Sequence, residues 1–316
     1  MEYRVLAYYI FTKIENPEAE VRRHKDILKS LDGRSRIYIS SEGVNGQLSL
    51  PASNVEAYVD WINADERFKG TEVKLHEWPE HAFAKLTVKV RKELVAVDRE
   101  IDLSKRGEYL SPAEWSAKLD NKDDETILID VRNNYESDVG YFEGAVCPDL
   151  ETFRGFPEYA KNLAKTVDPA KTKIMMYCTG GIRCEIYSAL MKDEGFDTVY
   201  HLKGGVIQYG LKEGKKHWRG KLFVFDDRLV VPISEDNEEI ISECRFCSEK
   251  SDTYYNCANM DCNDLFISCP KCVEEHEGCC SIKCLNEGRV RDFISDARPK
   301  PFRRLSKDEK LAIATL

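Results

Sequence analysis

Residues 178–184 read Cys-Thr-Gly-Gly-Ile-Arg-Cys, and this stretch decides the fold of the central part of the chain. It follows the apolar run 174–177 and precedes a helical pattern over 185–194. A cysteine therefore stands where a strand ends and a loop opens a helix, a position at which backbone N–H groups converge, hold an anion and lower the pKa of a thiol. This position makes Cys178 the candidate nucleophile.

The residues after this cysteine fit the same interpretation. Gly180 and Gly181 permit a tight turn, and Arg183 can offer a charged fork across the loop mouth. The anion cradle is expected to consist of Thr179, Gly180, Gly181 and Ile182. The alternative is a buried structural cysteine that precedes a glycine turn. Both readings stay open for Cys184, which is either a resolving thiol or a packing residue of the first helical turn.

Composition predicts a soluble globular chain of two or three domains, with 316 residues of which 42% are apolar and 33% charged. The first apolar run has no basic region before it, and no run reaches transmembrane length, so we expect neither a signal peptide nor a membrane partner. Twelve cysteines without a secretory signal favour a reducing, cytoplasmic setting, where they act as catalysts or metal ligands.

The net charge of −9 speaks against general nucleic-acid binding, but basic residues gather locally. Candidate nucleic-acid contacts are Lys203, Lys212, Lys215, Lys216 and Arg219. Two further basic clusters lie at 85–92 and 289–304. Each of these clusters alone is typical of a solvent-exposed surface. Three such clusters in a chain with a candidate nucleophilic cysteine leave nucleic acid as a possible partner.

Four segments are expected along the chain. Residues 1–97 alternate as a βαββαβ, ferredoxin-like α+β domain, in which 41–46 is expected to be a turn. Residues 108–218 alternate strands and helices and predict an α/β domain with a parallel sheet, in which Asp130 and Arg132 brace the sheet and the loop. A loop is expected at 140–145. Residues 219–240 contain a covering strand and an acidic linker, and 241–316 form a cysteine-rich region with a basic tail.

The cysteine-rich region holds nine cysteines between 244 and 284. Alternating pairs predict two interleaved tetrahedral sites, the first from Cys244, Cys247, Cys269 and Cys272, and the second from Cys257, Cys262, Cys280 and Cys284. Cys279 or His276 is an alternative to Cys280 in the second site. Zinc in a closed, structural role is the expected metal, because so short a segment needs a staple to fold.

These segments together resemble a known family. The loop from Cys178 to Arg183 has the form Cys-x-x-Gly-x-Arg and resembles the active-site loop of rhodanese-type sulfurtransferases; 130–136, 140–145 and 204–205 are similar to the other motifs of that fold. Gly140-Tyr141-Phe142 departs from the Gly-His-Ile of many rhodaneses. With an acylphosphatase-like first domain carrying Ser-Glu-Gly-Val-Asn-Gly at 41–46, and a cysteine-rich end, the chain resembles the bacterial TrhO (YceA) family of tRNA uridine 5-hydroxylation proteins.

The resemblance implies conversion of the wobble uridine of tRNA, at position 34, to 5-hydroxyuridine, with molecular oxygen as co-substrate and an electron donor that stays open. It also implies that Cys178 is a persulfide-type nucleophile and that Arg183 and the loop amides hold its anion. One hypothesis is that the thiolate adds to C6 of uracil and thereby makes C5 nucleophilic. Two alternatives are a thiosulfate-type sulfurtransferase and a non-enzymatic redox or protein-interaction module.

Overall fold

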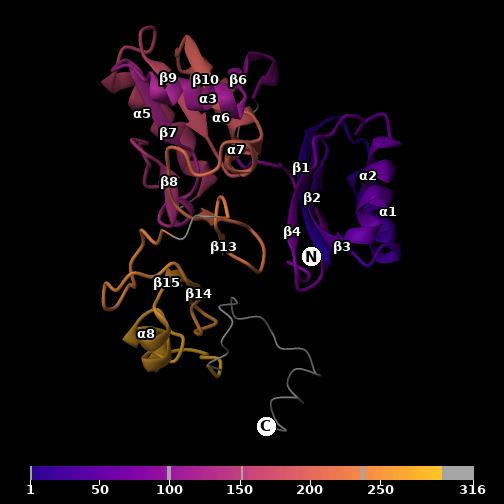
Figure 1. Cartoon of the computed structure of the whole chain (residues 1–316), viewed down its shortest axis with the longest axis vertical. Coiled ribbons are helices and arrows are strands. Elements are labelled where there is room, and N and C mark those ends of the chain that lie inside the picture. Colours follow the sequence, from indigo (N-terminus) through magenta and orange to yellow (C-terminus); the bar gives the residue numbers. More distant parts are fainter. Residues whose placement is uncertain (1, 98–100, 151, 236–238, 294–316) are drawn as a thin grey trace.

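The computed structural model describes residues 2–97, 101–150, 152–235 and 239–293, and three folded parts follow one another along the chain (Figure 1). The central α/β part lies beside the N-terminal sheet, and the cysteine-rich part lies at the far end of the long axis from β9 and β10. Of the basic cluster at 289–304, residues 294–304 lie outside the described residues. None of the helices in the described ranges is both long and apolar enough to cross a membrane.

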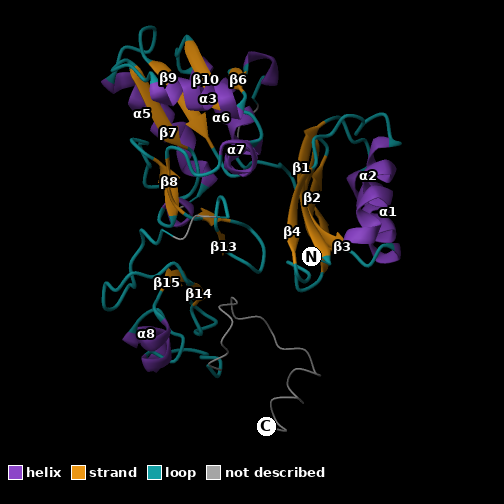
Figure 2. Ribbon diagram, in the orientation of Figure 1, coloured by secondary structure: helices purple, strands orange, loops and turns teal. Residues whose placement is uncertain are grey.

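The N-terminal domain is one mixed sheet with two helices on one face (Figure 2). Its strands lie in the order β4-β1-β3-β2-β5, which is the ferredoxin-like order with β5 added at the edge beside β2. The elements are β1 (Tyr3–Phe11), α1 (Pro17–Ser30), β2 (Arg34–Ser40), β3 (Gly43–Pro51), a 3-10 turn (Ala52–Asn54), α2 (Val55–Asn63), β4 (Lys74–Trp78) and β5 (Leu86–Val90). Apolar residues of the sheet pack against both helices, so the opposite face is left for the α/β domain.

The turn expected over 41–46 is wrong in extent, because β3 already begins at Gly43. Gly43 pairs with Phe11 across β1 and β3, and a Cβ atom there would stand 2.0 Å from the Ile10 carbonyl oxygen. A Cβ at Gly46 would in turn overlap the ring of Tyr8. The glycines therefore serve close strand approach and not only a turn.

The central domain is a four-stranded parallel sheet in the order β6-β10-β9-β7. Its elements are a 3-10 turn (Leu103–Lys105), β6 (Glu108–Leu110), α3 (Pro112–Asp120), β7 (Thr126–Asp130), α4 (Asn134–Ser137), β8 (Gly140–Phe142), a 3-10 turn (Phe153–Gly155), α5 (Phe156–Thr166), β9 (Lys173–Tyr177), α6 (Ile182–Asp193), β10 (Thr198–Leu202) and α7 (Gly205–Glu213). One core lies between the sheet and α5 and α6, and a second lies between the other face and α3 and α7. The α/β prediction is thereby confirmed.

The loop expected at 140–145 is partly a strand, because β8 pairs with β11 (Trp218–Gly220). Gly140 has no room for a side chain, since a Cβ would lie 1.9 Å from the Lys221 carbonyl oxygen.

The remaining elements are β12 (Leu222–Phe223), β13 (Val230–Val231), β14 (Tyr254–Asn256), β15 (Leu265–Ile267), α8 (Pro270–Glu275) and α9 (Ile282–Asn286). The mixed fold class with a cysteine-rich C-terminal region is confirmed.

Candidate active site and metal clusters

Cys178 follows β9 directly and is fully buried. The Gly181 N–H donates to Cys178 Sγ at 3.1 Å, and Gly181 adopts φ of +106°, a conformation that favours glycine. The amides of Val206 and Ile207, in the first turn of α7, donate to the carbonyls of Cys178 and Thr179 at 3.0 and 3.1 Å. The start of α7 therefore holds the loop, and of the four residues expected to form the anion cradle, Gly181 supplies an N–H to the sulfur.

This environment favours the thiolate form of Cys178. Burial opposes ionisation, but the Cys184 thiol, the Arg183 charge and the N–H groups of Cys184 and Gly181 outweigh it and lower the pKa of Cys178 to about 5. Burial and the neighbouring Cys178 sulfur raise the pKa of Cys184 well above the usual range. Cys184 thus stays protonated and can donate to the Cys178 sulfur.

Arg183, expected to span the loop mouth, is buried and bound to Glu136 of α4. Its Nη1 lies 2.5 Å from Glu136 Oε2, and its Nη2 lies 2.8 Å from Glu136 Oε1. Thr179 donates its hydroxyl to the same carboxylate at 2.8 Å. The sequence pattern places Glu136 in a motif over 130–136 but assigns it no role at the site, so Glu136 is a site residue that sequence reasoning missed.

Asp130 and Arg132 form a separate buried pair behind the loop. Arg132 Nη2 lies 2.6 Å from Asp130 Oδ2 and 2.5 Å from the Gly140 carbonyl oxygen. The Tyr177 hydroxyl, at the end of β9, also donates to Asp130 at 2.9 Å. The pair and Tyr177 connect β7, β8 and β9 by hydrogen bonds, and the bracing role of Asp130 and Arg132 stays a prediction.

The N-terminal domain reaches the Cys178 loop through two side chains that the sequence did not single out. Tyr9 of β1 donates to Glu185 Oε1 at 2.7 Å, and its hydroxyl would stand 2.9 Å from a Cβ at Gly181. Lys74 of β4 is buried and donates to the Gly180 carbonyl oxygen at 3.0 Å. Residues more than 100 positions apart in the sequence therefore build one site.

A cavity of about 250 Å³ lies between the helix-free face of the N-terminal sheet and the Cys178 loop. The loop contributes Thr179, Gly180, Ile182 and Arg183 to its lining. The sheet contributes Ala7, Tyr9, Arg36, Tyr38, Asn45, Gln47 and Lys74. Phe225, after β12, also borders the cavity, and its carbonyl accepts from Arg36 Nη1 at 2.8 Å. The site is thus shared by two domains.

The basic residues predicted to contact tRNA are spread along α7 and β11. Lys216 binds Asp120 and Arg219 binds Glu239, each at 2.6 Å, while Lys203 and Lys212 are exposed. Lys215 lies close enough to Glu239 to lower the pKa of that carboxyl, whose main partner is Arg219. None of the five lines the cavity.

The basic cluster on β5 lies nearer to the cavity. Lys89 is the register partner of Tyr38, which lines the cavity, and the Arg91 guanidinium lies 4.7 Å from the centre of the Tyr38 ring. Both basic residues are exposed. A polyanion bound across the cavity mouth would meet this cluster.

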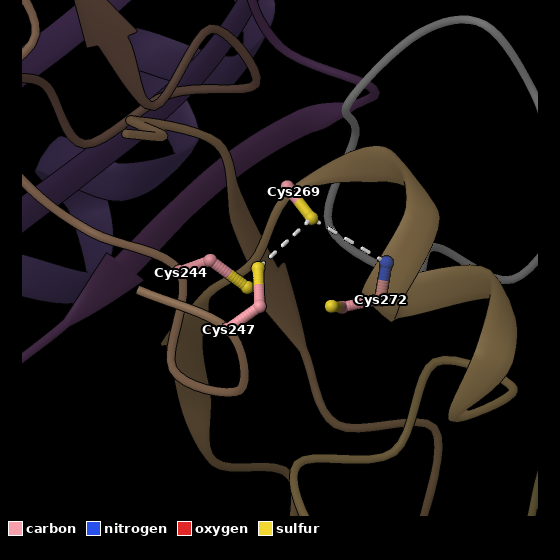
Figure 3. Close-up of side chains that lie close together, drawn as sticks. All are labelled: Cys244, Cys247, Cys269 and Cys272. Atoms are coloured by element: carbon pink, nitrogen blue, oxygen red, sulfur yellow. Dashed lines mark hydrogen bonds between the residues drawn. The ribbon is translucent and has the colours of Figure 1, made fainter. Parts of the chain in front are cut away.

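Eight cysteines gather in the two groups that alternation predicted, Cys244, Cys247, Cys269 and Cys272, and Cys257, Cys262, Cys280 and Cys284 (Figure 3 shows the first group). Within each group the sulfurs lie within 4.8 Å of one another. Sulfur pairs at 3.7 Å in both groups match the edge of a tetrahedron about 3.8 Å long that zinc–sulfur bonds produce. Both groups can hold a metal ion.

The two alternatives to Cys280 are placed elsewhere. Cys279 is buried outside both groups, and the His276 ring stacks on Phe246 with the ring centroids 3.8 Å apart. All twelve cysteines are free thiols in the structure. The two cysteine groups are therefore candidate metal sites, and the structure records none of these cysteines in a disulfide.

Family models match three segments of the chain. Residues 3–94 match an acylphosphatase-like domain of the UPF0176 type, residues 111–211 match a rhodanese-like domain, and residues 219–285 match a rhodanese C-terminal region. The fold and the cysteine loop thus define a rhodanese-domain protein with an acylphosphatase-like domain before it and a cysteine-rich region after it.

Similar curated proteins show which family within this class the chain belongs to. A protein of Protochlamydia amoebophila is 51% identical over 95% of this chain and 93% of its own length, and one of Chlamydia trachomatis serovar D is 52% identical over 96% and 92%. Both are named tRNA uridine(34) hydroxylase. The chain belongs to the tRNA uridine(34) hydroxylase family, and the resemblance to the TrhO family is confirmed. Among solved structures, a rhodanese-like domain from Anabaena covers 35% of this chain and 78% of its own length, with 18% identity and a TM-score of 0.30.

Proposed function

We propose that this protein hydroxylates C5 of the wobble uridine, position 34 of tRNA, with molecular oxygen as co-substrate. The observation that carries the proposal is a thiol of pKa about 5 on a loop whose following residues line a cavity of about 250 Å³ at the junction of two domains. The family membership supports the same reaction. A wobble base is unpaired, so it enters such a cavity without the cost of opening a duplex.

The cavity offers the groups that a uracil ring needs. The side-chain amides of Asn45 and Gln47 lie on the lining and can pair with the N3–H donor and the carbonyl acceptors of the base. Tyr38 and Phe225 offer aromatic faces for stacking. The base would then lie between the sheet and the loop that carries Cys178.

The ionised sulfur gives the site its chemistry. In the proposed first step, Cys178 Sγ forms a bond to C6, and the C5–C6 electron pair moves toward C5 and O4. C5 is then nucleophilic and accepts one oxygen atom. The second oxygen atom leaves as water, with two electrons and two protons from an external donor. Loss of the C5 proton and departure of the sulfur restore the ring double bond.

Nucleoside analysis tests this function. Bulk tRNA from a deletion strain should contain no 5-hydroxyuridine or its derivatives when its nucleosides are analysed by mass spectrometry. Expression of the wild-type chain should restore these nucleosides, whereas expression of Cys178→Ala should not. A covalent complex with 5-fluorouridine tRNA should form with wild type and be absent for Cys178→Ser. The sulfurtransferase alternative would replace the proposal if Cys178→Ala hydroxylated normally and the wild type converted thiosulfate and cyanide to sulfite and thiocyanate. The names of the relatives do not favour that alternative.

We further infer that each four-cysteine group holds zinc in a structural role, in a protein of the reducing cytoplasm. A cytoplasmic tRNA enzyme with twelve free thiols fits this setting. Four thiolates close the coordination sphere and leave no position for a substrate. Zinc would fix the region around the short strands β14 and β15, which bury little apolar surface alone.

A further inference from the structure

Lys74 stands apart from the other charged groups around the Cys178 loop. It belongs to the N-terminal domain, yet only 6% of its surface is exposed and its Nζ lies 3.0 Å from the Gly180 carbonyl oxygen. Its side chain passes Gly204, where an added Cβ would stand 3.3 Å from the Lys74 Cε atom. The Tyr9 ring lies below it, with the centroid 5.4 Å from Nζ. A long cation is therefore held at one place between two domains.

The nearby buried charges are paired with one another. Arg183 is bound to Glu136 by two hydrogen bonds, and Glu185 accepts from Arg106 at 3.0 Å as well as from Tyr9 and Tyr109. Lys74 has no carboxylate partner among the described ion pairs and binds a neutral carbonyl instead. Among the described residues its charge therefore has no direct ion pair, although Glu72 and Glu185 lie near enough to favour it.

Titratable groups from several elements lie near Lys74. They include Glu72 on its own segment, which is exposed, Tyr9 on β1, Cys178 on the loop and Glu185 on α6. Burial lowers the pKa of Lys74 from its usual value, while the negative charges of Glu72, Cys178 and Glu185 oppose that shift. Around Cys178 stand Arg183, Cys184 and the N–H groups of the loop. An anionic sulfur and the Lys74 ammonium thus support each other.

We propose that Lys74 is a positioning residue that the N-terminal domain contributes to the active site, where its ammonium fixes the Gly180 carbonyl and stabilises the anionic sulfur of Cys178. The full reactivity of the thiol then requires the N-terminal domain to be docked on the loop. This gives the acylphosphatase-like domain a chemical task in addition to any contact with substrate. The inference concerns the thiol itself and does not depend on tRNA being the substrate.

Thiol titration in the full chain tests this proposal. The alkylation rate of Cys178 by iodoacetamide is followed from pH 4 to 9 by peptide mass spectrometry for wild type, Lys74→Met and Lys74→Arg, with Lys69→Met, an exposed lysine of the same domain, as the matched control. Removal of the positive charge should raise the apparent pKa of Cys178 by about one unit, so alkylation below pH 5 becomes about tenfold slower. Lys74→Arg and Lys69→Met should follow the wild-type curve.

Two results would overturn the assignment. One is a Lys74→Met curve that coincides with wild type, and the other is a Lys74→Arg curve shifted as far as that of Lys74→Met, because side-chain shape and not charge would then matter. Urea unfolding midpoints show that each variant is folded, and Lys74→Gln replaces Lys74→Met if the latter does not fold. Because no tRNA is present, failure of the hydroxylation proposal leaves this result untouched.

Discussion

Glu136 accepts hydrogen bonds from both terminal nitrogens of Arg183, at 2.5 and 2.8 Å, and the two side chains are buried together. The arginine of the Cys-x-x-Gly-x-Arg loop is thus held by an acid 47 positions earlier in the chain. Burial alone would raise the pKa of Glu136, but Arg183 and Arg132 hold it below its usual range. The ion pair fixes the shape of the loop, while the Arg183 charge still helps to ionise Cys178.

Breaking the ion pair between Glu136 and Arg183 should lower the free energy of unfolding. Glu136→Gln leaves the Arg183 charge buried without its acid, and we expect a loss of about 3–5 kcal/mol in the free energy of unfolding, measured by urea titration. Asp168→Asn breaks an exposed ion pair with Lys171 and should cost less than about 1 kcal/mol. Equal losses for the two variants would show that the buried pair has no special weight.

The pH dependence of Cys178 follows from its lowered pKa. The thiolate is the majority form above pH about 5, so alkylation of Cys178 should be half-maximal near that pH and nearly constant from pH 6 upward. In urea the midpoint should return to about 8.5, the value of an ordinary thiol. A native midpoint near 8.5 would remove the basis for Cys178 as the nucleophile.

Cys184 should tune this titration through its protonated thiol. The thiol donates toward the Cys178 sulfur, so Cys184→Ala removes a donor and should raise the pKa of Cys178 by about one unit. Cys184→Ser keeps a donor and should shift it less. A different result is that neither variant shifts the midpoint, but oxidant no longer protects Cys178 from alkylation by forming a Cys178–Cys184 disulfide. Cys184 would then have only the resolving role.

Local pattern predicted the parts of the site that depend on spacing. The Cys178 loop and the two cysteine groups follow from residues close in the sequence, whose geometry a turn or a metal dictates. Glu136, Tyr9 and Lys74 could not be found this way, because their roles arise only when α4 and the N-terminal sheet pack on the loop.

The predicted boundaries of two strands are wrong for a related physical reason. The sequence predicts a turn at Gly43 and a loop at Gly140, whereas each glycine lies in a strand where a neighbouring carbonyl oxygen leaves no space for a Cβ. A glycine that permits a turn and one that permits close strand approach look alike in a single sequence. Only the neighbouring carbonyl group in the folded structure, that of Ile10 or Lys221, distinguishes them.

Metal content should follow the two cysteine groups. Elemental analysis of the full chain should find about two zinc ions per chain, and Cys262→Ser should reduce this to about one, because three sulfurs hold zinc less tightly than four. Cys279→Ser is the matched control, since Cys279 is buried in the same region but outside both groups, and it should keep two. A loss of metal from Cys279→Ser equal to that from Cys262→Ser would mean that the ligand sets are different.

The last prediction concerns the basic cluster on β5. Lys89 is exposed and is the register partner of Tyr38 at the cavity, so it should contact a phosphate of bound tRNA. Lys89→Met in a Cys178→Ser background should weaken tRNA binding and reduce the slope of log K against log salt by about 0.7 to 0.9, which corresponds to one released counterion. Lys69→Met removes an exposed lysine that already pairs with Glu66, and it should leave the slope unchanged. Parallel slopes for Lys89→Met and the Cys178→Ser parent would show that tRNA approaches the cavity from another side.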